Sequence, residues 1–260
     1  MATGRKAAPV TGTAITTAML ERRPPDTASD TDALAGALVK LLAWLSPSFP
    51  VGAYTYSHGL EWAIEDGTVG RAADLERWLG AVLRHGGGRN DAILFAHAHR
   101  AAWDDRVQEL RDIAALAAAF QPSRERHLEA TAQGRAFLVA VSGAWSNDRL
   151  AHLAEVLGAD AAVAYPVAVA IAAAAHRIPI DMALVACLNA FVANIVSAGI
   201  RAIPIGQTDG QRVIAALAPV CREVAEAAAV ADLDELGGIA LRADIASMKH
   251  ETQYTRLFRS

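Results

Sequence analysis

The feature that most constrains this chain's fold is the stretch of residues 181–210, whose first two thirds are apolar on nearly every face of a helix. A surface helix carries one apolar stripe and a charged back, whereas this segment leaves no side for solvent. We therefore expect a buried helix around which the rest of the chain packs. Its apolar positions are Met182, Leu184, Val185, Leu188, Phe191, Val192, Ile195 and Val196.

The same stretch is long enough to compare with a membrane span, because roughly 20 apolar residues cross a bilayer. Arg177, Asp181 and Arg201 bracket it, and Asn189 and Asn194 interrupt it. Each charge would cost about 2.5 to 3.5 kcal/mol at the bilayer centre. The sequence therefore favours a helix inside a soluble bundle, with no membrane partner.

The end of this stretch predicts a sharp turn followed by another helix. Pro204 and Gly206 are typical turn residues. Thr208 and Gln211 have the spacing of a capping box, in which each side chain satisfies a free backbone N–H of the first turn. We expect the second helix to begin there.

Helical periodicity continues through the rest of the chain, and no segment shows the alternation of a strand. The sequence predicts an all-α, single-domain bundle of about ten helices. Besides the helix after residue 181, helices are expected over 32–45, 60–67, 75–83, 93–103, 113–120, 128–141, 150–157, 166–176, 213–230 with a kink or break at Pro219, and 239–253.

The chain of 260 residues contains no Gly/Ser-rich or Pro-rich linker after residue 33, so one domain over residues 34–260 is expected. Residues 1–33 are rich in Ala, Thr and Pro and read as a disordered leader. They lack an apolar run beside Arg22 and Arg23, so they do not form an export signal. We expect a cytoplasmic protein.

Composition points to protein or small-molecule partners. A net charge of −4 and a pI near 6.1 give no basic footprint for nucleic acid, which needs clustered Lys and Arg. The 53% hydrophobic content and mean hydropathy of +0.22 favour tightly packed helices and self-association, so a homodimer is expected.

The cysteines and most histidines do not predict a metal or cofactor site. Cys187 and Cys221 form no C-x-x-C pair and read as small core residues. The triple glycine at residues 86–88 lacks the Lys-Ser/Thr of a phosphate-binding loop and reads as a turn between helices. His97 and His99 are two residues apart, so a helix directs them to different faces.

One pair could in principle carry chemistry. His58 and Glu61 share a helical face and could act as acid and base or as metal ligands. The simpler interpretation is a capping turn or an exposed polar pair. The chain has no H-E-x-x-H, G-x-S-x-G or dinucleotide-binding glycine motif, so no catalytic residue, metal ligand or cofactor is expected.

Three polar-aromatic segments are not explained by a plain bundle: residues 46–61, 203–211 and 249–260. A C-terminus is usually loose unless something holds it. This one combines Tyr254, Leu257 and Phe258 with His, Gln and Arg residues, which is the composition of a binding surface. The alternative is a last helix that packs on its own domain.

The same three segments resemble the signature segments of the UreF family of urease accessory proteins. They are SPSFPVGAYTYSHGLE at 46–61, IPIGQTDGQ at 203–211, similar to a family segment PLGQTDGQ, and HETQYTRLF at 250–258. The resemblance covers residues 34–260. It is weakest over 103–157, where only helix pattern and length match, and residues 1–33 have no counterpart.

This resemblance implies a non-enzymatic, all-α, dimeric scaffold. UreF-like proteins join UreD (called UreH in some organisms) and the GTPase UreG, and the assembly delivers nickel to apo-urease. The alternative that it implies is an activator or gate of the GTPase UreG, acting through an arginine such as Arg201 or Arg256. Partner binding is expected at Tyr54, Tyr56, His58, Glu61, Arg201, Gln207, Asp209, Gln211, His250, Glu251, Tyr254, Arg256, Leu257 and Phe258.

Overall fold

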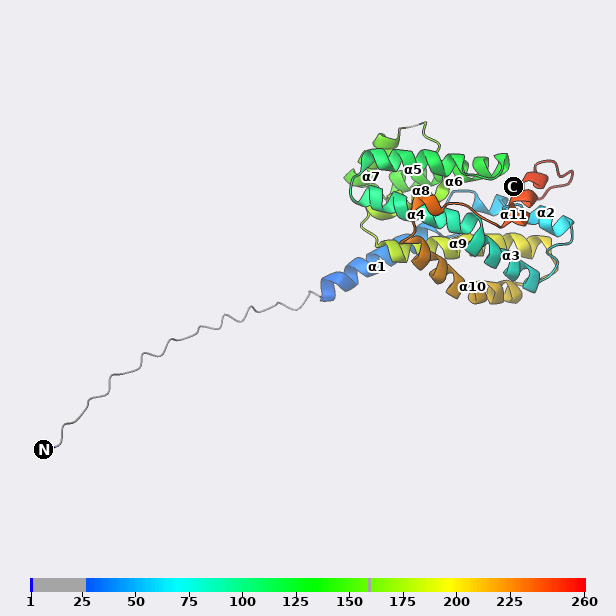
Figure 1. Ribbon diagram of the computed structural model, residues 1–260, viewed down its shortest axis with the longest axis horizontal. Helices are drawn as coiled ribbons and strands as arrows, with labels where there is room; N and C mark the ends of the chain where they lie inside the picture. The colour runs from blue at the N-terminus through cyan, green and yellow to red at the C-terminus, as the bar shows by residue number, and fades with distance from the viewer. Residues whose placement is uncertain (2–26, 159) are drawn as a thin grey trace.

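The computed structural model describes Met1 and residues 27–158 and 160–260, with side chains from residue 31 onward. These residues form eleven α-helices and two short 3-10 helices, and they contain no strand (Figure 1). The predicted all-α class is confirmed. The helices are α1 (Thr27–Trp44), α2 (Leu60–Glu65), α3 (Ala72–His85), α4 (Gly87–Trp103), α5 (Val107–Ala119), α6 (Arg124–Ala144), α7 (Asp148–Leu157), α8 (Tyr165–Ala175), α9 (Ile180–Ala202), α10 (Gln207–Ala228) and α11 (Leu241–His250), with η1 (Ala53–Thr55) and η2 (Leu233–Glu235).

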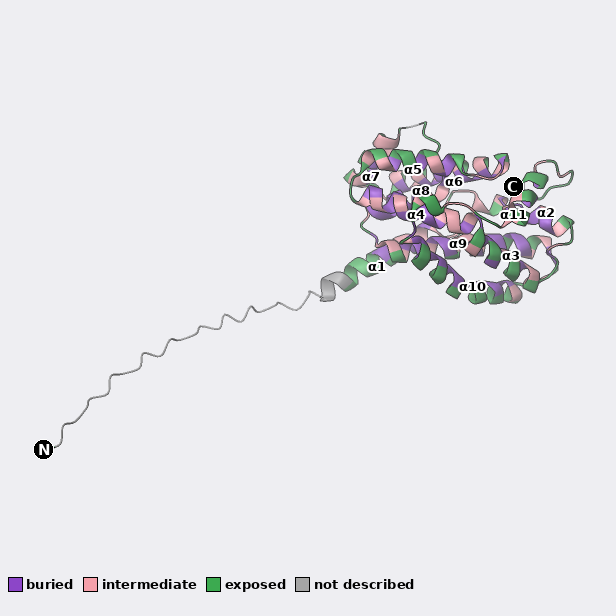
Figure 2. Ribbon diagram, in the orientation of Figure 1, coloured by how far each residue is buried: buried purple, intermediate pink, exposed green. Residues whose placement is uncertain are grey.

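The helix most completely buried in the bundle is α8 rather than the long apolar helix α9. Every residue from Val167 to Ala175 is buried, and α8 packs most extensively on α4 and α6. The reason is side-chain size. Alanine lets neighbouring helices approach from every side, so a short Ala-rich helix fits where a Leu- or Phe-rich one would not. Figure 2 shows buried residues concentrated in the middle of the bundle.

Helix α9 is buried on one side only. Leu184, Leu188 and Val192 are in the core, as expected. The other side is only partly covered, and Asn189 and Ser197 on it are exposed. Within the described residues, α9 is the one helix long and apolar enough to cross a membrane. Half of its apolar 18-residue stretch is buried in the bundle. It packs against α10 and α8 as a helix of the bundle.

Several predicted helix boundaries are wrong by a few residues. Helix α10 begins at Gln207, not at Thr208. The acceptor at its start is Asp209, whose Oδ2 lies 3.5 Å from the Gly206 N–H. The helix also continues through Pro219 without a break, because the ring of Pro219 lies on an exposed side. The last helix ends at His250, and the following residues are irregular.

The first helix begins at Thr27, inside the segment expected to be a disordered leader, while residues 2–26 lie outside the described part of the chain. Helix α1 projects from the bundle (Figure 1). Of the leucines predicted to form its buried face, Leu41 is buried, whereas Leu34, Leu38 and Leu42 are exposed. The pattern identified the helix correctly but not its surroundings.

The predicted turn at the triple glycine is confirmed, since Gly86 alone separates α3 from α4. A Cβ atom on Gly88 would lie 2.9 Å from the Cα of Leu83, so glycine permits the two helices to cross closely. The two cysteines are buried free thiols. Burial raises the pKa of Cys187 to about 12 and that of Cys221 to about 11, which keeps both thiols protonated.

The contact between α6 and the start of α8 depends on Gly134, where an added Cβ would lie 2.0 Å from the carbonyl oxygen of Val163. We expect Gly134→Ala to lower the free energy of unfolding by about 1–3 kcal/mol or more, because a backbone atom cannot move aside easily. Thermal and urea unfolding measure it. At Gly143 in the same helix an added Cβ would have no atom within 4 Å. We therefore expect Gly143→Ala to raise the free energy of unfolding by up to about 1 kcal/mol. Equal effects of the two substitutions would contradict this account.

Candidate functional site

The C-terminal segment, residues 251–260, folds back onto the loop that precedes α2. The Arg259 N–H donates to the Thr55 carbonyl (2.8 Å), and the Ser57 N–H donates to the Ser260 carbonyl (2.7 Å). The Ser57 hydroxyl donates to the same Ser260 oxygen. Two of the three segments singled out in the sequence are thus joined by backbone hydrogen bonds (Figure 1).

Glu61 receives this segment in the interior. Its carboxylate is buried and accepts from the N–H groups of Leu257 (2.6 Å) and Phe258 (3.0 Å). It also accepts from Nε2 of His250 (3.0 Å). Hydrogen bonds to an ionised group are roughly twice as strong as neutral ones, so this one side chain fixes both the end of α11 and the returning backbone.

His250 is completely buried between two carboxylates. Its Nε2 faces Glu61, and its Nδ1 lies 2.6 Å from Oε2 of Glu125. Each ring nitrogen is therefore within hydrogen-bond distance of a carboxylate oxygen. Arg256 donates to the other oxygen of Glu125 (2.6 Å). Glu125 thus contacts both the end of α11 and the guanidinium of the tail.

A second carboxylate on α6 holds the last residue. Glu129 is buried and accepts from the hydroxyl of Ser260 and from the guanidinium of Arg126. Burial by itself would raise the pKa of Glu129. The neighbouring Arg126 and His58 outweigh burial and hold that pKa well below its usual range. Glu129 is therefore a charged group whose partners include the chain terminus. We call Ser57, Glu61, Glu125, Glu129, His250 and residues 256–260 the tail clasp.

Two further contacts complete the clasp. Glu251 accepts from the N–H of Arg124 (2.8 Å) at the first turn of α6, where a negative charge is favoured by the helix dipole. Phe258 is buried, and the guanidinium of Arg201 lies 4.5 Å from the centre of its ring, within cation–π range. Arg201 belongs to the end of α9, so the tail also reaches the helix that leads to the third signature segment.

The structure divides the expected partner-binding residues into two groups. The buried ones are Tyr56, Glu61, His250 and Phe258. Among these, Glu61 accepts hydrogen bonds from the side chain of His250 and from the backbone of Phe258 in the tail. His58 and Glu61 are not an exposed pair, since Glu61 is buried and faces the tail while His58 faces α6. They do flank Gly59, the residue that caps the start of α2. Exposed or partly exposed are Tyr54, Arg201, Gln207, Asp209, Gln211, Glu251, Tyr254, Arg256 and Leu257.

Sequence reasoning missed the contribution of α6. Glu125, Arg126 and Glu129 lie in the segment where the resemblance is weakest, yet they hold the tail. The available signal was the spacing of Arg126 and Glu129, which are three residues apart and share a helical face. That spacing is common on solvated helices, so it did not by itself indicate a buried ion pair.

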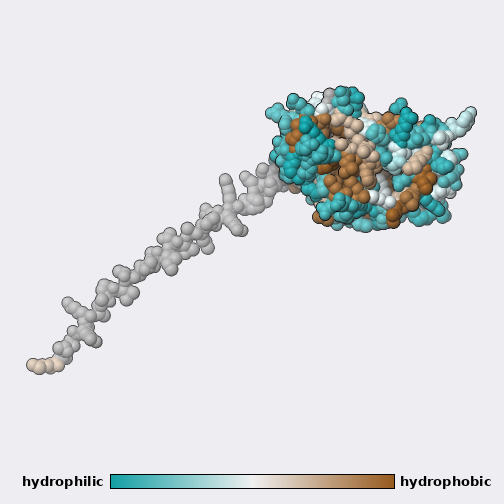
Figure 3. Space-filling view, turned by 45° about the horizontal axis from the view of Figure 1, so that its top comes forward, coloured by the Kyte–Doolittle hydropathy of each residue, from teal (hydrophilic) through white to brown (hydrophobic). Residues whose placement is uncertain are grey.

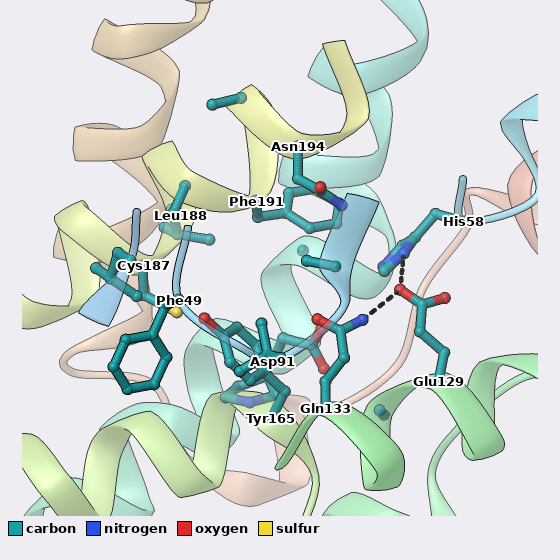
Figure 4. A pocket seen from close by; sticks show the side chains of 18 of the residues that line it. Phe49, His58, Asp91, Glu129, Gln133, Tyr165, Cys187, Leu188, Phe191 and Asn194 are labelled. Carbon is teal, nitrogen blue, oxygen red and sulfur yellow. Dashed lines mark hydrogen bonds and ion pairs between the residues drawn. The ribbon is translucent and has the colours of Figure 1, made fainter. Parts of the chain in front are cut away.

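A cavity of about 170 Å³ lies beside the clasp, between α4, α6, α9 and the loop before α2. Its walls are mostly apolar, and its polar end carries His58, Asp91 and Glu129 (Figure 4). A second cavity of about 190 Å³ shares the lining residues His58, Asp91 and Arg126 with the first. These three side chains therefore form the partition between two hollows.

The partition is an unusual electrostatic environment. Nδ1 of His58 lies 2.8 Å from Glu129 and 2.6 Å from Arg126, while its Nε2 is buried with no partner in the described part of the chain. Burial, followed by the charge of Arg126, lowers the pKa of His58. Burial raises the pKa of Asp91 to about 6, although Arg126 opposes the shift.

These groups do not form a metal site. Within the described residues, no three His, Cys, Asp or Glu side chains are placed to hold one metal ion. His97 and His99 point to different backbone carbonyls, those of Ala231 and Ile178, as the spacing predicted. Among His58, Asp91 and Arg126 there is no nucleophile with an adjacent base.

The raised pKa of Asp91 makes a prediction about stability. A folded pKa near 6 against 3.8 unfolded means that the fold favours the protonated form. The contribution of Asp91 to the free energy of unfolding is therefore fully present below about pH 4 and is lost as the pH rises through 6. Two pKa units correspond to about 3 kcal/mol. We expect Asp91→Asn to be more stable than the wild type at pH 7, by up to that amount, and equally stable near pH 4.

Urea unfolding of both proteins from pH 4 to pH 7 measures this difference. Asp112→Asn, at an exposed position, serves as the control and should stay within about 0.5 kcal/mol at every pH. A loss of stability in Asp91→Asn at pH 7 would show instead that Asp91 is ionised and that its attraction to Arg126 dominates.

Buried charges in this bundle hold the chain's own end in place, while aromatic and apolar side chains of that end remain outside. The described residues thus form an all-α bundle with an ordered, partly exposed C-terminal segment. Comparison with known sequences identifies the family. The chain belongs to the UreF family of urease accessory proteins, whose family model, described as UreF, matches residues 69–218.

Similar proteins carry the same description. A urease accessory protein UreF of Rhodopseudomonas palustris is 54% identical over 240 residues, which cover 91% of this chain and 100% of that protein. One of a Bradyrhizobium species is 50% identical, covering 92% and 98%. One of Methylobacterium radiotolerans is 54% identical, covering 85% and 96%. By its family the chain is an accessory protein and not the urease enzyme.

Proposed function

We propose that this chain is a non-enzymatic scaffold that joins UreD (UreH) to the GTPase UreG and is required for nickel insertion into apo-urease. Membership of the UreF family supports a role in urease maturation. The observation that carries the proposal is the tail clasp, which fixes a segment with exposed side chains to a rigid bundle. A pre-ordered surface loses less entropy on binding than a loose tail.

The surface offered by the clasp contains the residues expected to bind a partner. Tyr254 is fully exposed and Leu257 is 71% exposed. Tyr54 is 64% exposed, and it precedes Thr55, whose carbonyl accepts from the tail. Exposed aromatic and apolar side chains on an ordered segment are typical anchors of a protein interface. We assign this surface to UreD.

Self-association is proposed along the partly covered side of α9. Val185, Ala190 and Ala193 on this side are half-buried, and the cavity beside them opens between α9 and the preceding loop. An apolar face of small residues suits a two-fold contact in which the same face of each copy meets. A homodimer formed in this way would leave the tail clasp of each copy accessible.

The tail cannot be tested by deletion. Removing residues 249–260 would leave Glu61 and Glu129 buried without several of their donors, and breaking a buried ion pair from one side costs about 3–5 kcal/mol. Loss of binding would then reflect loss of folding. Substitutions at exposed tail positions avoid this difficulty.

We therefore expect Leu257→Asp and Tyr254→Ala to abolish co-purification with UreD while the thermal unfolding midpoint stays within a few degrees of the wild type. An aspartate in place of Leu257 would bring an unpaired charge into the interface. Val139→Asp is the matched control, because Val139 is 69% exposed on α6 and should retain binding. Undiminished co-purification of both tail variants would refute the assignment of this surface.

The alternative, a GTPase-activating arginine, is less well supported by the two arginines concerned. Arg256 is paired with Glu125, and Arg201 lies over the ring of Phe258, so each would have to leave a partner to reach a nucleotide. We expect Arg201→Ala to leave single-turnover GTP hydrolysis by UreG unchanged in the presence of this chain. A fall of about 10³-fold or more, the contribution of an arginine finger, would favour the alternative.

A further inference from the structure

Helix α11 carries an apolar stripe that faces away from the bundle. Leu241, Ile245 and Met248 recur at intervals of four and three residues, which places them on one side of the helix. They are 62%, 52% and 49% exposed, and Ile239, just before the helix, is 78% exposed. The opposite side is fixed at Gly59, where an added Cβ would lie 2.6 Å from the backbone nitrogen of Ser247.

The first residue of the stripe, Leu241, lines a surface groove of about 510 Å³ between α3 and the start of α11, and Ile245 and Met248 lie outside this groove. Trp78 lines the groove, is partly buried and packs against the hydrophobic core, and the buried Val69 and Val82 line the groove as well. The opposite wall consists of Ile239 and Leu241. The apolar surface of Trp78, Ile239 and Leu241 is therefore partly open to solvent, and an apolar segment of a bound partner would cover it. On the face drawn in Figure 3, apolar areas likewise interrupt the hydrophilic surface.

The rim of the groove is positively charged. Asp74 is the one carboxylate lining the groove, and it accepts from Arg71 (3.3 Å) and Arg77 (2.6 Å). One carboxylate leaves most N–H donors of the two guanidinium groups available, and both side chains are more than two-thirds exposed. Arg242, on the other wall, is exposed and forms no ion pair within the described residues. Two guanidinium groups, those of Arg77 and Arg242, therefore line the groove with one carboxylate, Asp74, which also accepts from Arg71.

We propose that this groove binds an acidic amphipathic segment of a partner protein, with apolar side chains on Trp78 and Leu241 and carboxylates on Arg77 and Arg242. Planar guanidinium groups suit carboxylates because they donate two parallel hydrogen bonds. The proposal rests on the scaffold function proposed above and adds a second docking face beside the tail clasp, on the same helix.

Two other occupants fit the charges less well. The chain's own residues 2–26 are basic, so the rim would repel them; their charged residues are Arg5, Lys6, Glu21, Arg22, Arg23 and Asp26. A second copy that met this groove with its own would place like-charged rims opposite each other in a two-fold contact, which is unfavourable. An acidic partner is attracted at long range and at contact.

The test uses the full chain with purified UreD and purified UreG, each titrated separately. In hydrogen exchange, one of the two proteins is expected to protect residues 74–82 and 239–245. The dissociation constant of that complex should rise at least about tenfold in the double variant Arg77→Glu, Arg242→Glu and in Leu241→Asp. It should also rise with salt, as for a charged interface.

The controls are Val230→Asp and Arg222→Glu, which change an exposed apolar residue and an exposed charge elsewhere. They should stay within about twofold of the wild type. Unchanged affinity of the groove variants, with no protection of either segment, overturns the groove and leaves the scaffold function intact. Failure of the wild-type chain to bind either protein overturns both. If residues 74–82 and 239–245 become protected from hydrogen exchange without UreD or UreG, and more so at higher concentration of this chain, the groove binds a second copy and the proposal of an acidic partner is wrong.

Discussion

The structure depends on two buried carboxylates that take part of their hydrogen bonds from the C-terminal segment. Glu61 accepts two backbone N–H groups of the tail and one nitrogen of His250. Glu129 accepts from the terminal serine and from Arg126. An ionised group inside a protein without partners costs several kcal/mol. The last residues are therefore part of the folded domain, and the loop before α2 is fixed together with them.

The alanine-rich core is what brings the second carboxylate to the tail. Helix α6 packs on α8, and it approaches the backbone at the start of α8 closely because Gly134 has no Cβ. Glu129 lies five residues before Gly134 in α6. The packing at the centre thus sets the position of a charge at the edge. A bulkier α8 would move α6 outward and separate Glu129 from Ser260. Core packing and the binding surface are linked through this one helix.

The sequence predicted what depends on local pattern and missed what depends on assembly. Helical periodicity gave the all-α class, and the motif at residues 46–61 drew attention to Glu61, but nothing local shows that Glu61 is buried beneath residue 258. Helix α9 packs against more elements than α8, as expected of a central helix, but α8 is the more completely buried of the two. Alanine scores low on hydrophobicity, and its small size decided the arrangement.

Glu129 also connects the tail to the partition between the two cavities, since it contacts Ser260 on one side and His58 on the other. Pulling the tail out would remove a donor from Glu129 and leave the strained backbone of His58, whose φ is 60°, without the hydrogen bonds of the neighbouring Ser57 to the chain end. A partner that displaced the tail would have to offset these losses. A partner that docks on the exposed side of the ordered tail does not, so the clasp favours binding to the folded segment over its withdrawal.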